Sequence, residues 1–190
     1  MTTFDLDRFV GDCVEAADTD DPLGAVAEVV GRAVSDPRSV RYRFEVPLDP
    51  DDDGILHRSP GLFVTWAVFP RGFATGIHDH GVPAVIGGWA GEEANRLYRP
   101  TAAGLEACGS SRVTPGDVVT LDAETAHDVH VQGPSWSGAL HVYLGDILTL
   151  DRHEWARPDD PATPFDPQDQ ERRWTAAAQA TGLLAAPHGG

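Results

Sequence analysis

Two histidines one residue apart, His78 and His80 in G-I-H-D-H-G-V-P-A-V-I-G-G-W (76–89), are the residues of this chain best placed to do chemistry. Residues i and i+2 of a strand project to the same face, so the two imidazoles would point together and Asp79 would point away. Imidazole nitrogens bind divalent transition metals at about 2.0–2.2 Å. The spacing therefore predicts two ligands of one metal ion, and a third must come from another strand.

Candidates for the third ligand lie further along the chain. His127 and His130 are three positions apart in E-T-A-H-D-V-H-V, so on one strand they face opposite ways and at most one of them joins the site. His141, in A-L-H-V-Y-L, is a further candidate. A His-x-His pair alone is weak evidence, because such pairs also occur on polar strand faces. The glycines and apolar residues around this pair favour a buried site, where imidazoles need partners.

Short strands separated by turns are the elements expected to position these histidines. Apolar residues at helical spacing predict two helices, over 4–17 and 23–34. Strict alternation in V-R-Y-R-F-E-V predicts a strand over 40–46. Turn signals then recur to about residue 150, which is typical of an all-β sandwich or barrel. The further strands expected are 62–69, 76–80, 84–90, 93–99, 118–121, 127–132 and 137–144.

Three segments are expected along the chain: an N-terminal helical segment (1–38), a β-barrel (39–150) and a C-terminal wrap and tail (151–190). Within the last segment, the Pro- and Asp-rich stretch 156–170 indicates an extended wrap, and 170–180 is compatible with a helix. The final A-A-P-H-G-G is expected to be disordered. His153 lies in this segment and is expected to play no part in the site.

Composition narrows the classes of partner. The chain has 30 acidic and 14 basic residues and a net charge of −16, which argues against binding nucleic acid or an anionic membrane. Two cysteines, Cys13 and Cys108, imply no disulfide framework and fit a reducing compartment. The longest apolar run, 62–69, is too short to span a bilayer, and the N-terminus lacks a signal-peptide core. We expect a cytoplasmic protein that acts on a small molecule, with its oligomeric state left open.

The histidine region resembles the first motif of the cupin superfamily. In G-F-A-T-G-I-H-D-H (72–80) a glycine and five further residues precede His-x-His, and Gly91 matches the closing glycine of the motif. The glutamate ligand that is usual in this motif falls at Ala84 or Val85, and neither side chain binds metal. The resemblance therefore implies a site of histidines without a carboxylate.

Over about residues 55–166 the chain resembles, more closely, the cysteine dioxygenase family of thiol dioxygenases and its bacterial cupin relatives. The resemblance rests on I-H-D-H, P-G-D-V, the downstream His127, L-H-V-Y, and the R-x-x-W and P-F-D segments. It implies a mainly β fold, the cupin double-stranded β-helix or jelly-roll barrel. It also implies Fe(II) held by His78, His80 and His127, with His141 and Tyr143 lining the pocket. The implied activity is an Fe(II)-dependent dioxygenase that oxidises a small thiol to a sulfinate with O2.

The sequence departs from this family at three places. The stretch G-V-P-A-V after the second ligand holds no cysteine, so the thioether crosslink of the family is not expected. The serine that precedes the pocket histidine in animal enzymes is Ala139. The region matching the arginine that holds the substrate carboxylate is the acidic D-P-D-D-D-G, and Arg58 is the nearest replacement as a substrate-binding residue.

These departures keep other functions open. A three-histidine cupin oxygenase acting on a diketone or phenolic substrate is one alternative, and a non-catalytic cupin that binds a metal or small molecule is another. Imidazole ligands also accept divalent transition metals other than iron.

Overall fold

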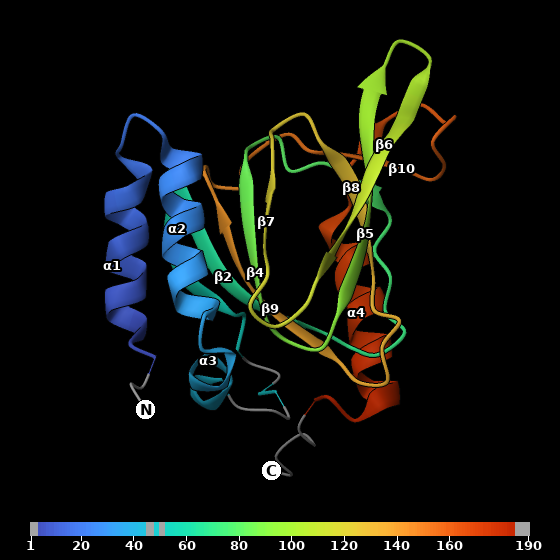
Figure 1. Cartoon of the computed structure of the whole chain (residues 1–190). Coiled ribbons are helices and arrows are strands. Elements are labelled where there is room, and N and C mark those ends of the chain that lie inside the picture. The colour runs from blue at the N-terminus through green and yellow to red at the C-terminus, as the bar shows by residue number, and fades with distance from the viewer. Residues whose placement is uncertain (1–3, 45–47, 50–51, 185–190) are drawn as a thin grey trace.

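A computed structural model describes residues 4–44, 48–49 and 52–184, which form two antiparallel β-sheets and four helices (Figure 1). The first sheet has the order β1 (Ile55–Ser59), β2 (Leu62–Phe69), β9 (Ser137–Tyr143), β4 (Ala84–Ala90) and β7 (Val118–Leu121). The second has the order β11 (Thr163–Pro164), β10 (His153–Trp155), β3 (Ile77–His78), β8 (Ala126–His130), β5 (Glu93–Thr101) and β6 (Gly104–Val113). The predicted mainly β fold is confirmed, and its two sheets are consistent with a jelly-roll barrel.

Helices α1 (Leu6–Ala17), α2 (Pro22–Val34) and α3 (Pro37–Arg43) cover the outer face of the first sheet (Figure 1). Both predicted N-terminal helices are present, and a carboxylate accepts a backbone N–H at the start of each, from Asp5 in α1 and Asp21 in α2. The apolar face of α2 packs against β4 and β7, and the fully buried valines 26, 30 and 34 lie on α2. Each such valine contributes about 1.5–3 kcal/mol by its burial.

The strand predicted over 40–46 is wrong, because residues up to Arg43 belong to α3. Pro37 stands in the first turn of this helix, where its missing N–H costs nothing. Val40 and Phe44 are buried while Tyr42 is 86% exposed. The apolar residues that matter are thus four apart, which is the spacing of a helix face. Residues 45–46 lie outside the described part of the chain.

Most other predicted strands are present, with adjusted ends. β2, β4 and β7 occupy the predicted residues, while β3, β8 and β9 are shorter than predicted. A hairpin joins β5 to β6 with its tip at 102–103. Four strands, β1, β6, β10 and β11, were not predicted from the sequence. The exposed β6, L-E-A-C-G-S-S-R, has no apolar alternation that would reveal it.

The C-terminal segment returns to the barrel. β10 pairs with β3, and α4 (Pro167–Thr181) begins earlier than the predicted 170–180 because Asp166 caps its first N–H groups. Trp174 of α4 donates its indole N–H to the Val68 carbonyl at 2.7 Å, in the part of β2 that extends past its pairing with β1. Residues 185–190, expected to be disordered, lie outside the described residues. None of the described helices is long and apolar enough to cross a membrane.

The barrel interior is formed by residues that alternate inward along both sheets. Its apolar part comprises Phe63, Ala84, Ile86, Val113, Leu121, Ala139 and Tyr143. Phe63, Tyr143 and Ala84 stand side by side in the register of β2, β9 and β4. Polar side chains inside the barrel cluster around β3 and β8, and these build the candidate site.

Candidate metal centre

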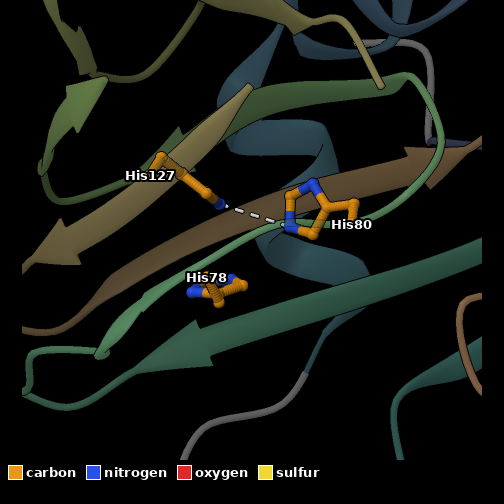
Figure 2. A group of neighbouring side chains, drawn as sticks. All are labelled: His78, His80 and His127. Carbon is orange, nitrogen blue, oxygen red and sulfur yellow. Dashed lines mark hydrogen bonds between the residues drawn. The ribbon is translucent and has the colours of Figure 1, made fainter. Parts of the chain in front are cut away.

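The side chains of His78, His80 and His127 converge inside the barrel (Figure 2). One ring nitrogen from each lies within 4.8 Å of the others, and all three residues are buried. His78 on β3 stands opposite His127 on β8 in the antiparallel register, and His80 follows directly after β3. His78 and His80 point to the same centre, as the i, i+2 spacing predicts. Of His127 and His130, only His127 joins them, which also agrees with the spacing.

Hydrogen bonds fix which nitrogen of two rings faces the centre. His78 donates Nδ1–H to the Gly76 carbonyl, and His127 donates Nδ1–H to Asn95 Oδ1, each at 3.0 Å. Because these oxygens accept, the Nε2 atoms carry free lone pairs. His127 Nε2 lies 3.2 Å from His80 Nε2 (Figure 2, dashed line). Two nitrogens bound to one cation at about 2.0–2.1 Å and roughly 90–110° apart would be separated by about 3.0–3.4 Å. The donor set therefore fits a transition metal ion.

Burial keeps these imidazoles uncharged at neutral pH. It lowers the pKa of His78 to about 4, and the nearby positive charge of Arg152 lowers this pKa as well. The pKa of His80 and of His127 lies well below the ordinary value. Burial is the larger cause, and the neighbouring imidazoles add to it. A neutral imidazole is the form that binds a metal, so the three ligands are ready without losing protons.

Two further predicted site residues lie beside the centre. His141 and Tyr143 are two apart on β9, share its inner face, and form a hydrogen bond of 3.1 Å between Nδ1 and the hydroxyl. The ring centre of Tyr143 is 4.9 Å from that of His80. Burial raises the pKa of Tyr143 to about 12 and lowers that of His141 to about 4, so both are uncharged near pH 7.

Arg58 is placed differently. Its Nε donates to Asp146 Oδ2 over 2.9 Å, and its side chain is 46% exposed. Among the described contacts, none joins Arg58 to the three histidines.

Arg152 is a residue that sequence reasoning missed. Its Nε donates to the Asp79 carbonyl at 3.1 Å, and its guanidinium carbon lies 4.0 Å from the ring centre of Phe165. That ring is in turn 5.6 Å from the ring of His78. The positive charge of Arg152 contributes to the lowered pKa of all three histidines. No carboxylate of the described residues forms an ion pair with it. The R-x-x-W motif marked this residue, but gave no reason to place it at the site.

His153 lies outside the group of three histidines, as expected, but it contacts the residue between two of them. Its backbone N–H donates to Asp79 Oδ1 at 2.8 Å, and its Nδ1 lies 3.0 Å from Asp79 Oδ2. Residues 152 and 153 together therefore hold Asp79, which stands between the two histidines of the motif. His130, by contrast, faces away and lies 3.1 Å from an Arg96 nitrogen.

Comparison with known proteins gives likeness in structure alone. No protein-family model matches the chain, and no curated protein matches it. Solved structures similar to it include a DMSP lyase from Ruegeria pomeroyi (TM-score 0.42, 21% identity), covering 54% of this chain and 47% of the lyase. A cupin superfamily protein from Desulfitobacterium hafniense gives TM-score 0.39 and 16% identity, covering 48% of this chain and 74% of that one. A cupin 2 conserved barrel domain protein from Leptotrichia buccalis gives 0.39 and 20%, covering 47% and 38%.

Each of these structural matches covers about half of this chain. The chain spans less than half the length of the Ruegeria lyase. Overlaps of this size carry no information on substrate, so activity must be argued from the site itself.

Proposed function

We propose that this protein is a mononuclear Fe(II)-dependent dioxygenase that oxidises a small thiol to a sulfinate with O2. The observation that carries the proposal is the set of three buried, neutral imidazoles, His78, His80 and His127, converging without a carboxylate. Bound Fe(II) would supply binding positions for sulfur and oxygen and the redox chemistry between them. The reaction balances as RSH plus O2 giving RSO2H, and no other redox cofactor is needed.

The charge of the donor set favours an anionic substrate. A site of two histidines and one carboxylate lowers the charge of a divalent cation by one, whereas three imidazoles leave it at 2+. A more cationic centre attracts a thiolate more strongly, and a coordinating thiol is deprotonated. The missing carboxylate at Ala84 and Val85 is therefore a chemical argument for a sulfur ligand.

Tyr143 and His141 are the proposed catalytic pair. The Tyr143 hydroxyl is held by His141 at 3.1 Å, and the tyrosine ring packs edge-on against the ligand His80. A phenol that keeps its proton at neutral pH can donate a hydrogen bond to bound oxygen or substrate. His141 fixes the direction of that hydroxyl, in the way a hydrogen-bonded neighbour orients a group at a metal site.

Arg152 supports a substrate that carries its own anionic group. Its guanidinium is held at Nε by the Asp79 carbonyl and by the Phe165 ring, which leaves its two terminal nitrogens without a carboxylate partner among the described residues. Planar guanidinium groups bind carboxylates through paired hydrogen bonds. A thiol with a carboxylate, such as cysteine or mercaptopropionate, therefore fits this centre better than cysteamine. Arg58 stays the alternative carboxylate-binding residue predicted from the sequence.

Oxygen uptake by the iron-loaded protein tests the proposal. The panel is cysteine, mercaptopropionate and cysteamine, with His127→Ala as the variant that removes one ligand. Uptake that depends on a thiol, yields a sulfinate and is lost in the variant supports the proposal. Silence across the panel, with iron measured in the protein, would contradict it and favour a diketone or phenolic substrate, or a binding role without catalysis.

A further inference from the structure

A buried acid stands inside the barrel without a basic partner. Glu93, at the start of β5, is 1% exposed. Ser137 Oγ donates to its Oε1 over 3.1 Å, while its Oε2 is buried with no partner among the described residues. An ionised carboxylate in such a place loses its hydration without a cation to replace it, which costs several kcal/mol. Burial accordingly raises the pKa of Glu93 to about 7, and the Ser137 hydrogen bond opposes this shift.

Two more buried polar atoms without partners occupy the same interior, Asn95 Nδ2 and His141 Nε2. Asn95 follows Glu93 by two positions on β5, so both side chains lie on one face of that strand. His141 follows Ser137 by four positions on β9 and again shares its face. The inward position between them on β9 is Ala139, whose side chain is a single methyl group.

The β5 side of this interior leads to a proposed metal ligand. From the contact of Glu93 with Ser137, the next inward residue of β5 is Asn95. Its Oδ1 accepts the Nδ1–H of His127 at 3.0 Å. The amide that orients His127 therefore keeps a buried, unpartnered Nδ2 on the same face of β5 as the acid.

The β9 side leads to the proposed catalytic pair. From Ser137 the inward residues are Ala139, His141 and Tyr143, and the last two share a hydrogen bond of 3.1 Å. Burial raises the pKa of Tyr143, and the negative charge of Glu93 adds to this effect. The acid is therefore close enough for its charge to act on the centre.

We propose that Glu93 is the proton acceptor of this centre, joined to it by ordered water that bridges Glu93 Oε2, Asn95 Nδ2 and His141 Nε2. Three such atoms left unsatisfied would each cost about 1–3 kcal/mol. A buried water with two to four polar neighbours is the usual way in which proteins satisfy them. The inference rests on the proposed function, because the proton is the one that a thiol loses when its sulfur binds at the three histidines. The S–H bond breaks, the proton passes through the water, and the carboxylate becomes a carboxylic acid with no change in oxidation state.

Other titratable groups of the interior do not compete for this proton near neutrality. They are His127 on β8, His78 and His80 at β3, and His141 and Tyr143 on β9, with Arg152 beside the histidines. The β6 residue opposite Glu93 is the apolar Val113. The imidazoles have a lowered pKa and Tyr143 a raised one, so Glu93 is the member of this group that changes its protonation in the neutral range.

Infrared difference spectroscopy of the metal-loaded protein, without any substrate, tests whether Glu93 takes up and loses a proton near neutral pH. The wild type should show the C=O absorption of a protonated carboxylic acid at about pH 6 that is lost by about pH 8, as expected for an acid with pKa near 7. The band should be absent in Glu93→Gln, which keeps the shape of the neutral acid, and unchanged in Glu92→Gln, the half-buried neighbour that pairs with Arg112. Ser137→Ala should move the midpoint to higher pH, because it removes a hydrogen bond to the ionised form. A carboxylate that is already ionised at about pH 6 would overturn the proposal.

Proton release on anaerobic binding of mercaptopropionate, followed with an indicator dye, tests whether Glu93 accepts the proton that the thiol loses. The Glu93→Gln protein should release about one proton per bound thiol at both pH values, since one S–H bond breaks. The wild type should match it at about pH 6 and release less at about pH 8, because the negative charge of the bound thiolate raises the pKa of Glu93 and lets the ionised acid keep part of the proton. Equal release by both proteins at the higher pH would refute the role of Glu93. Absence of thiol binding by both, despite a titrating infrared band, would instead refute the proposed function and the thiol as proton source.

Discussion

Asn95 Oδ1 lies 3.0 Å from His127 Nδ1, and this contact joins β5 to β8 inside the barrel. Asn95 is 2% exposed and has no other hydrogen bond from its side chain in the described structure. The contact holds the His127 ring in one orientation and places its Nε2 lone pair toward His80. Asn95 thereby does for His127 what the Gly76 carbonyl does for His78.

Replacing this amide should weaken metal binding while the barrel stays folded. Partners of this kind typically contribute 10–100-fold to metal affinity, so Asn95→Leu should raise the Kd for Fe(II) by about 10–100-fold. Asn95→Asp should restore most of the affinity, since a carboxylate also accepts the Nδ1–H. Competition with a metallochromic chelator measures both values. Equal affinity in the wild type and the leucine variant would show that packing alone orients His127.

The metal ligands could be predicted from local sequence because strand periodicity fixes which side chains share a face. His78 and His80 needed only the i, i+2 rule, and the register of β3 with β8 brings His127 to them. Asn95 and Glu93 gave no such signal. Their roles depend on which strand of the other sheet they meet, which is a long-range property that no local pattern encodes.

Arg152 and α3 show two different failures of local reasoning. Arg152 reaches the centre because β10 returns to pair with β3, some 75 residues earlier in the chain. The segment 40–46 alternates like a strand, yet the helix forms because Val40 and Phe44 bury against the sheet and the helices while Tyr42 stays in solvent. Tertiary burial decided between two periods that the sequence allowed.

Packing of α2 on β4 should be sensitive to one added methyl group. A Cβ at Gly87 would lie 2.3 Å from Val30 Cγ1 and 3.0 Å from Val34 Cγ1, and a β-branched neighbour moves little. Gly87→Ala should therefore lower the free energy of unfolding by about 1–3 kcal/mol. The matched control is Gly11→Ala in α1, where a Cβ meets nothing within 4 Å, and this change should stabilise by about 0.5–1 kcal/mol. Urea unfolding measures both, and the same sign for the two variants would contradict the packing argument.

Stability of the metal-free protein should fall as the pH drops from about 6.5 to about 4. The pKa of His78 and of His141 is lowered to about 4 in the fold, while unfolded histidine titrates at its ordinary value. Between the two values the unfolded chain binds the extra protons, so the free energy of unfolding rises with pH there. Each histidine adds a slope of about 1.4 kcal/mol per pH unit. His141→Asn should reduce the slope by that amount in urea titrations across this window, and an unchanged slope would show that His141 is not held neutral.

The two arginines can be separated by the substrate that each variant loses. Arg152→Gln should raise KM for mercaptopropionate by about 10–100-fold, because a hydrogen bond to a charged group is worth about 1.5–3 kcal/mol. The same variant should leave KM for cysteamine nearly unchanged, since that thiol has no carboxylate. Arg58→Gln is the matched control: with its guanidinium already paired to Asp146, it should change neither value. If Arg58→Gln alone impaired the carboxylate-bearing thiols, Arg58 would be the residue that binds them, and Arg152 would serve to hold the Asp79 carbonyl between the two ligands.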